Sequence, residues 1–372
     1  MHTAGFLATQ NVLFLIVFGA VIFFSLKKHS TAHSAELFSY ADSIELKGLA
    51  FCMVLFAHIG YFLFPQWGWG DQFLYPLSIL GGVAVNLFLF LSGYGLAQSA
   101  RTESPWQFYK RRFFKLYTPL WLSSLFIVAL DIIGKKQISF LHALPGFTGV
   151  ISHADLYTDF NSPLWFLTLL FLFYLVFPWI YKKEHPVRSA AFLLVFGAVV
   201  PGWLVLYAPF DGGVIHLWLL HALAFPLGVI IALGARRLHA GISWMSRSYW
   251  IRIPLFMIAL SAFVYFAVYS GVNTPSEEPI SIVILFLFLL LFLLAPFRSR
   301  LFRWLGIYSY EMYLIHWPLL FRHDILFFTL PAWFATVAYM AILLAIGFVM
   351  AWVSKNIFHL RSNISSAELG AH

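Results

Sequence analysis

The sequence predicts an all-α integral membrane protein, a polytopic bundle of about eleven transmembrane helices, and three observations lead to this expectation. Of the 372 residues, 61% are hydrophobic and only 10% are charged, whereas soluble domains carry about 25% charged residues. Apolar segments recur from residue 4 to residue 353, with no polar stretch long enough to fold by itself. The Lys and Arg residues gather in short clusters between these segments. The lipid bilayer is therefore the expected solvent and partner of most of the chain.

The expected helices follow from the length that a membrane requires, which is about 20 mostly apolar residues per span. The first apolar segment has no Lys or Arg before it, and Lys27 and Lys28 follow it. A cleavable signal peptide has the opposite arrangement, so this segment is expected to be a retained helix with its N-terminus outside. The predicted spans lie near 4–26, 47–64, 76–98, 113–133, 163–181, 189–208, 214–234, 253–271, 280–297, 304–321 and 329–353.

The basic residues predict the orientation. With the N-terminus outside, only Lys135, Lys136 and Arg322 of the 23 Lys and Arg residues fall on the external side. Cytoplasmic loops of membrane proteins are enriched in Lys and Arg, so the loops near 110, 184, 243 and 300 are expected in the cytoplasm and the loop near 145 outside. The same clustering argues against nucleic acid as a partner despite the net charge of +8.

The chain divides into three predicted parts: an extra N-terminal helix and cytoplasmic linker (1–39), one membrane domain (40–355) and a short polar cytoplasmic tail (356–372). The external connection 134–162 is long and polar enough to be a binding loop or a re-entrant segment. The single cysteine, Cys52, lies in an apolar segment, so no intrachain disulfide can form.

Lys47 and His58 are the first residues that carry chemistry. They are eleven residues apart, about three helical turns, so both project from one face and His58 lies ~16 Å from Lys47 along the helix. An ionisable side chain near the middle of a bilayer is costly and indicates a functional site. The alternatives are an interfacial anchor for Lys47 and a hydrogen-bonded core histidine for His58.

A basic cluster lies in the segment 108–119. Arg112 and Lys115 are spaced i, i+3, and Arg111 and Lys115 are spaced i, i+4, so these cations share a helix face. At a cytoplasmic helix entrance they suit a phosphorylated soluble ligand. Contact with lipid headgroups explains the charges equally well.

The segment 305–318 contains a polar stripe in an apolar surrounding. Ser309, Tyr313 and His316 are spaced i, i+4 and i+7 and therefore line one side of a helix. Such a stripe faces a bundle interior or a water-filled cavity, or it makes structural hydrogen bonds between helices. Glu311 is expected to point away from it and to pair with a neighbouring helix.

Four segments, in order, carry a resemblance to a known family: Glu45-Leu46-Lys47-Gly48 with His58, the run 84–94 that ends Leu91-Ser92-Gly93-Tyr94, the segment from Arg111 to Pro119, and the segment from Leu305 to His316. Leu164-Trp165-Phe166-Leu167 is a fifth, weaker match. Together they span about 40–355, and in this order they resemble the membrane-bound acyltransferase 3 family.

The resemblance implies a core of about ten helices that moves an acyl group, commonly acetyl, from cytosolic acyl-CoA to a hydroxyl, often of a glycan or glycolipid of the cell envelope. It also implies a multi-pass protein of a bacterial inner membrane or plasma membrane, with no metal. His58 matches the essential histidine, Lys47 stands where an arginine is usual, and Arg112 and Lys115 match a pair of arginines that handle the acyl donor. Lysine keeps the charge but loses bidentate phosphate binding. Asn86 stands where many members have an acidic residue that orients the histidine.

These residues lead to a hypothesis with His58, Asn86 and His316 as catalytic residues and His58 as the general base. Lys47, His316 or a tyrosine hydroxyl is expected to stabilise the oxyanion. The binding residues are expected to be Lys47, Arg111, Arg112, Lys115, Ser92, Trp165, Ser309 and Tyr313. The alternative is a transporter of a lipid-linked or polyanionic envelope precursor, although the two halves of the chain show no convincing internal match.

Overall fold

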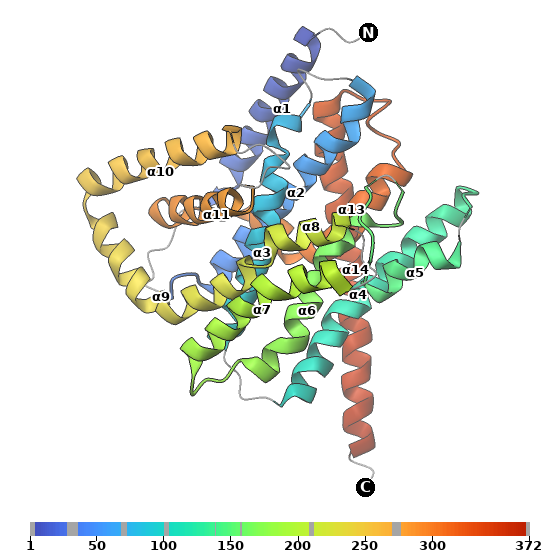
Figure 1. The fold of residues 1–372 in the computed structure, drawn as a ribbon. Helices are drawn as coiled ribbons and strands as arrows, with labels where there is room; N and C mark the ends of the chain where they lie inside the picture. The colour runs from blue at the N-terminus through green and yellow to red at the C-terminus, as the bar shows by residue number, and fades with distance from the viewer. Residues whose placement is uncertain are drawn as a thin grey trace.

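The computed structural model describes residues 4–27, 36–67, 73–99, 104–137, 139–156, 158–207, 212–269 and 277–369. Lys28 and Arg101, two of the predicted cytoplasmic cations, lie outside these ranges. Helices make up most of the described chain (Figure 1). They are α1 (Ala4–Ser25), α2 (Tyr40–Trp67), α3 (Ile79–Ser99), α4 (Pro105–Ile133), α5 (Phe140–Thr148), α6 (Trp165–Ile180), α7 (Pro186–Tyr207), α8 (Gly212–His221), α9 (Ala224–Arg247), α10 (Tyr249–Tyr269), α11 (Glu277–Leu294), α12 (Arg300–Ile307), α13 (Ser309–Arg322) and α14 (Ala332–Leu369), with 3-10 turns η1 (Tyr75–Leu77) and η2 (Ser162–Leu164) and strands β1 (Leu26–Lys27) and β2 (Arg298–Ser299).

Eight helical segments of the described residues are long and apolar enough to cross a membrane. The shorter apolar helices Thr9–Ser25 and Pro279–Leu294 fall where two further spans are predicted. The prediction of a polytopic all-α membrane protein is confirmed, with eight spans by length and composition instead of about eleven. The eight segments are Tyr40–Leu63, Ile79–Ser99, Pro105–Ile133, Ser162–Ile180, Pro186–Leu204, Gly213–Arg247, Tyr249–Ala267 and Ala332–Ile357.

The predicted span 304–321 is not one continuous helix, which corrects the expectation. Helix α12 ends at Ile307 and α13 begins at Ser309, because Tyr308 between them leaves the helical conformation with φ −105° and ψ 11°. Helix α13 has 14 residues, about 21 Å at 1.5 Å per residue, which is too short to cross a membrane alone. The break lies directly before Ser309, the first residue of the polar stripe.

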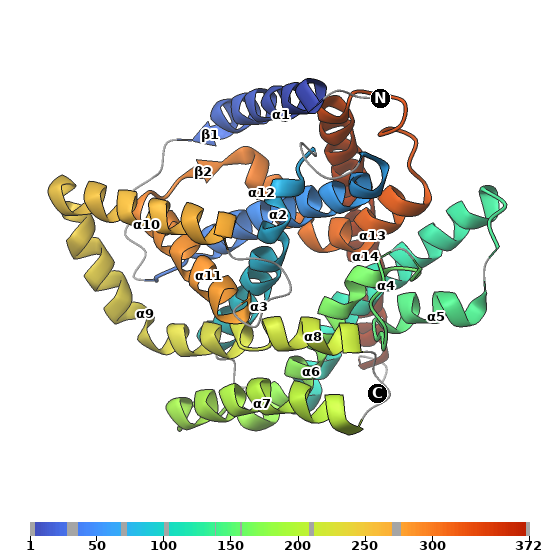
Figure 2. The same cartoon turned by 45° about the horizontal axis from the view of Figure 1, so that its top comes forward.

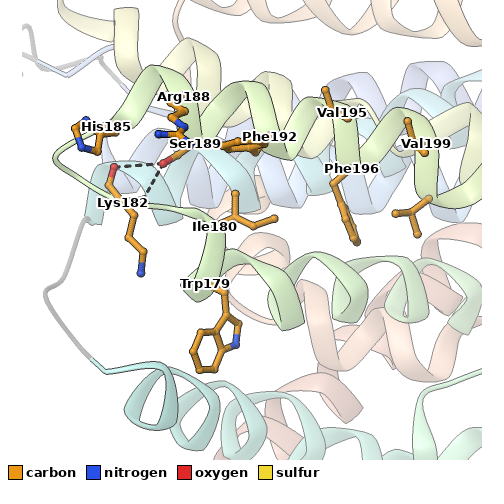
Figure 3. Close-up of a pocket in the computed structure, with 11 residues that line it drawn as sticks. Trp179, Ile180, Lys182, His185, Arg188, Ser189, Phe192, Val195, Phe196 and Val199 are labelled. Atoms are coloured by element: carbon orange, nitrogen blue, oxygen red, sulfur yellow. Dashed lines mark hydrogen bonds between the residues drawn. The ribbon is translucent and has the colours of Figure 1, made fainter.

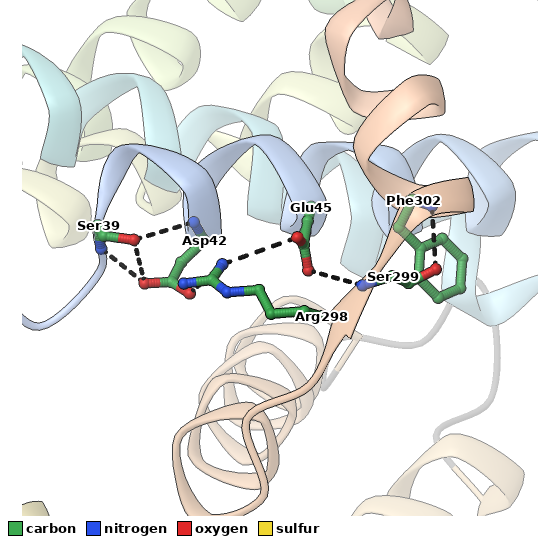
Figure 4. Close-up of polar contacts among 6 residues, drawn as sticks. All are labelled: Ser39, Asp42, Glu45, Arg298, Ser299 and Phe302. Atoms are coloured by element: carbon green, nitrogen blue, oxygen red, sulfur yellow. Dashed lines mark hydrogen bonds and ion pairs between the residues drawn. The ribbon is translucent and has the colours of Figure 1, made fainter. Parts of the chain in front are cut away.

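Polar contacts fix the start of α2 against β2 and α12 (Figure 4). Ser39 and Asp42 exchange hydrogen bonds in the first turn of α2, which satisfies backbone N–H groups that a helix start leaves unpaired. The guanidinium of Arg298 lies 2.7 Å from the Asp42 carboxylate and 3.8 Å from that of Glu45. Glu45 also accepts a hydrogen bond from the backbone N–H of Ser299. The position of Lys47 on α2 is thus set by a connection to the segment that leads into α12 and α13.

Two glycines allow α2 and α12 to touch through their backbones. A Cβ atom at Gly48 would lie 1.9 Å from the carbonyl oxygen of Phe302, and one at Gly306 would lie 1.8 Å from that of Ile44. No larger residue fits at either position without moving a helix. The glycines in two of the motif segments therefore hold α2, which carries Lys47 and His58, close to the chain that carries Ser309, Tyr313 and His316.

The predicted extra N-terminal helix packs on the outside of this group. Strand β1, directly after α1, pairs antiparallel with β2 (Figure 2). The ring of Phe14 is buried against Phe56 of α2 and Phe73 at centroid distances of 5.1 and 5.8 Å. At the other terminus, α14 continues as a helix to Leu369 through most of the predicted polar tail.

The predicted external connection contains the short helix α5, and an ion-pair cluster lies at the end of α4, the helix before it. Asp131, fully buried at the end of α4, accepts hydrogen bonds from Arg322 at 2.7 and 3.2 Å. Its carboxylate also lies 3.0 Å from His323. Burial and the nearby Lys136 lower the pKa of His323, although Asp131 opposes this shift. The cluster joins the ends of α4 and α13.

Candidate functional site

A pair of histidines from distant parts of the chain forms the centre of the candidate site. Nδ1 of His58 lies 2.7 Å from Nε2 of His316, and the two rings stack with centroids 4.9 Å apart. His316 is fully buried, while His58 is partly exposed. Helix α2 supplies one ring and α13 the other, and the close packing of α2 and α12 brings them together.

The hydrogen bonds assign the tautomers of both rings. Nδ1 of His316 lies 2.6 Å from the backbone carbonyl oxygen of Tyr313. A carbonyl only accepts, so this nitrogen of His316 carries the proton, and Nε2 of a neutral His316 is an acceptor. His58 then donates from Nδ1 to His316, which leaves Nε2 of His58 unprotonated. A neutral imidazole held in this tautomer has the lone pair that a general base needs.

Helix α13 is held in place by hydrogen bonds from three directions. The hydroxyl of Tyr313 donates to the carbonyl oxygen of Pro163, and that of Tyr339 donates to the carbonyl oxygen of His316. The side-chain amide of Asn161 donates to the carbonyl oxygen of Leu314 at 2.8 Å. These bonds fix the orientation of His316, and through it that of His58.

A second part of the site is a cavity of about 220 Å³ that is lined by most of the cations predicted to bind the donor. Lys47 reaches it from α2 and Arg112 and Lys115 reach it from α4. Six of the predicted binding residues line this cavity: Lys47, Ser92, Arg112, Lys115, Ser309 and Tyr313. The structure therefore brings together residues that are spread over about 270 positions of the sequence.

The surroundings of Arg112 suit the binding of an anion. Its guanidinium carbon lies 5.0 Å from the ring centroid of Tyr174 and 5.5 Å from that of Phe108. Its buried Nε has no hydrogen-bond partner within the described residues. A buried polar group without a partner is costly unless a ligand satisfies it. Stacked guanidinium groups are well suited to phosphate.

Tyr313 joins the cation cavity to the histidine pair. Its side chain lines the cavity, its ring centroid lies 5.3 Å from that of His316, and its carbonyl oxygen holds the proton on Nδ1 of His316. On α2, Phe51 lies between Lys47 and His58 in sequence and contacts the ring of His316 edge-on at 6.2 Å. The two parts of the site are therefore neighbours across one layer of aromatic rings.

Three predicted site residues lie elsewhere. Asn86 is fully buried, and its amide bonds Nδ1 of His221 at 2.8 Å and the hydroxyl of Ser281 at 3.1 Å. Trp165 stacks on His221 with centroids 5.2 Å apart. Because both polar atoms of the Asn86 amide are engaged there, the expected contact of Asn86 with His58 is not formed, and His316 takes that place. Arg111 does not line the cation cavity.

Glu311 and Tyr174 also line the cation cavity, although the sequence did not predict either of them there. Glu311 lines it and attracts Lys115 electrostatically, which corrects the expectation that Glu311 points away. An acidic residue in an apolar segment was the available signal for Glu311, whereas Tyr174 lies in an aromatic run that offered none.

The candidate oxyanion groups can be compared directly. Both ring nitrogens of His316 are engaged, one as donor to Tyr313 and one as acceptor from His58. The Tyr313 hydroxyl donates to Pro163. Lys47 is eleven residues from His58 on α2, which is ~16 Å. None of the three is placed to stabilise charge beside Nε2 of His58.

Comparison with known protein families gives a match over most of the length of the chain. Residues 42–353 match the family described as "Acyltransferase domain". The chain is also 34% identical over 131 residues to "Acyltransferase MdmB" of Streptomyces mycarofaciens, an alignment that covers 31% of the chain and 33% of the relative. The chain thus aligns with about a third of that protein. No solved structure matches. Within the described ranges, no group of three or more His, Cys, Asp or Glu residues is arranged to hold a metal ion.

Proposed function

Because the chain belongs to the acyltransferase 3 family of integral membrane acyltransferases, we propose that it transfers an acyl group, with acetyl the expected one, from cytosolic acyl-CoA to a hydroxyl of an envelope glycan or glycolipid. The observation that carries the proposal is the position of the cation cavity one aromatic layer from the histidine pair. A donor with phosphates at one end and a thioester at the other matches this arrangement.

The cations of the cavity hold the donor. Coenzyme A carries phosphates, and Lys47, Arg112 and Lys115 provide three positive charges on the side where the basic loops predict cytoplasm. The unpaired Nε of Arg112 gives one phosphate oxygen a charge-assisted partner. Glu311 also lines the cavity and attracts Lys115 electrostatically. The pantetheine arm then extends past Tyr313 toward His58.

The chemical step uses Nε2 of His58. This nitrogen takes the proton of the acceptor hydroxyl as the hydroxyl oxygen attacks the thioester carbonyl carbon. The C–S bond then breaks, and the leaving sulfur receives the proton from His58, so the products are an ester and free coenzyme A. While His58 is doubly protonated, its Nδ1–H still bonds His316, whose own Nδ1–H bonds the Tyr313 carbonyl. A positioned general base contributes typically 10²–10⁴-fold to rate.

The test separates donor binding from chemistry. Full-length protein in nanodiscs is assayed for acetyl-CoA affinity by calorimetry and for acetyl transfer to an envelope fraction with radiolabelled acetyl-CoA. We expect Arg112→Gln with Lys115→Gln to weaken acetyl-CoA binding by at least about 100-fold, because each of the two lost charged hydrogen bonds contributes about 1.5–3 kcal/mol. His58→Ala is expected to bind acetyl-CoA normally and to transfer no acetyl group.

The matched control is Arg236→Gln with Arg237→Gln, a second pair of cations predicted on the cytoplasmic side and exposed on α9. It removes the same charge without touching the cavity, so donor affinity should not change. Unchanged affinity in the Arg112 and Lys115 variant would make these residues topology signals and would contradict the proposed donor site. Near-normal transfer by folded His58→Ala protein would eliminate the proposed base.

A further inference from the structure

A second cavity lies between α6 and α7, away from the residues of the proposed acyl-transfer site. It has a volume of about 620 Å³ (Figure 3). One end is basic, because Lys182, His185 and Arg188 lie around the turn between the two helices. The rest of the lining is mostly apolar. From these features we propose that the cavity binds one anionic glycerophospholipid of the cytoplasmic leaflet, with its phosphate at the basic end and an acyl chain along α7.

The apolar wall has the length and exposure that an acyl chain requires. Phe192, Val195, Phe196 and Val199 are spaced i, i+3, i+4 and i+7 and follow one face of α7. Phe192, Val195 and Val199 are 51–57% exposed, so the groove is open to the hydrocarbon around the protein. From Arg188 to Val199 it runs eleven residues, about 16 Å, which is close to half of a ~30 Å hydrocarbon core. The groove is therefore about as long as one leaflet is deep.

The basic end is held at the mouth of this groove. Arg188 begins the same stripe, and its guanidinium carbon lies 5.3 Å from the ring centroid of Phe192. The Ser189 hydroxyl accepts a hydrogen bond from the backbone N–H of Lys182 at 2.9 Å, and it also donates to the Lys182 carbonyl (Figure 3). The turn is thereby fixed to the start of α7, with Lys182 and Arg188 on either side of the fixed point.

Charge selects the class of lipid. Glu184 is the acidic residue of this turn, against Lys182, Lys183 and Arg188, so the end is net positive. The turn is predicted to be cytoplasmic, where the leaflet carries anionic lipids, and basic pockets at this level bind anionic headgroups. Trp179 is 64% exposed and lines the same end, as aromatic residues at membrane interfaces do. Zwitterionic lipids fit the groove equally well but gain less from the cations.

The experiment measures lipid binding to the purified full-length protein by native mass spectrometry, with phosphatidylglycerol and phosphatidylcholine of the same acyl chains as probes. We expect one phosphatidylglycerol to bind more tightly than phosphatidylcholine. Lys182→Gln with Arg188→Gln should weaken phosphatidylglycerol binding by about 25-fold, at about 5-fold per cation, and should leave phosphatidylcholine nearly unchanged. Val195→Trp, which fills the groove and keeps the cations, should weaken both lipids.

Controls make each result decisive. Arg236→Gln with Arg237→Gln should bind phosphatidylglycerol as the wild type does; an equal loss there would reveal a general surface attraction and overturn the proposal. Glycerol phosphate that competes as well as phosphatidylglycerol would identify a soluble ligand and overturn it too. All variants should retain the wild-type melting temperature. That measurement shows that they are folded and does not depend on the proposed acyl transfer.

Discussion

The replacement of His316 by phenylalanine tests the tautomer assignment most directly. Phenylalanine keeps an aromatic ring that can stack on His58 but removes both ring nitrogens. It therefore deletes the 2.7 Å contact with His58 Nδ1 and the 2.6 Å contact with the Tyr313 carbonyl. Nδ1–H of His58 is then left without its acceptor in a largely buried position.

The size of the effect follows from that unpaired group. A buried donor without a partner costs about 1–3 kcal/mol. His58 avoids the cost only by moving its proton to Nε2, where it no longer acts as a base. Because 1.36 kcal/mol corresponds to a tenfold change in rate, kcat is expected to fall by about 5- to 150-fold. KM for acetyl-CoA should stay constant, because the cation cavity is unchanged.

The assay is initial-rate acetyl transfer at varied acetyl-CoA, with His58→Ala as the lower limit. His316→Gln serves as the conservative variant, since its side-chain oxygen can accept from His58 as Nε2 of His316 does. We expect it to recover part of the rate lost in His316→Phe. A wild-type kcat in folded His316→Phe protein would refute the idea that His316 sets the tautomer of His58, and a loss confined to KM would place His316 in donor binding instead.

Three further predictions concern orientation, packing and pH. Glu184→Cys should react with a membrane-impermeant maleimide only after cells are permeabilised, because the turn between α6 and α7 is predicted to be cytoplasmic. The native Cys52 is buried and should not react. Labelling of Glu184→Cys in intact cells would reverse the predicted topology. Gly306→Ala should lower stability by about 1–3 kcal/mol or more in thermal unfolding, because its Cβ would meet the Ile44 carbonyl oxygen at 1.8 Å, whereas Gly241→Ala on α9, with no atom within 4 Å, should be neutral or stabilising. The pKa of His323 is lowered below the ordinary 6.5, so the unfolded chain binds this proton more readily than the folded chain. The contribution of neutral His323 to stability is therefore present above about pH 6.5 and is lost as the pH falls. His323→Asn should show a smaller drop in melting temperature on acidification than the wild type, and an identical drop would contradict the assignment.

The sequence by itself determined the class of protein and most of the positions that matter. Apolar segments of spanning length can be recognised from composition, since the bilayer imposes one length and one polarity on every span. The stripe of Ser309, Tyr313 and His316 and the face shared by Lys47 and His58 follow from the helical period alone. Their presence in an apolar surrounding marks them for function, because unpaired polar groups in a membrane are costly.

Tertiary structure alone decided which of these groups meet. His58 and His316 are 258 residues apart, and no local pattern states that α2 and α12 approach to backbone contact, although Gly48 and Gly306 make it possible. The partner of Asn86 was predicted wrongly for the same reason, because a residue on α3 can face either neighbour and the packing placed it against His221. Helical periodicity fixes the direction of a side chain relative to the axis of its helix. The tilt and rotation of the helices, and breaks such as the one at Tyr308, are set by contacts between segments far apart in the sequence.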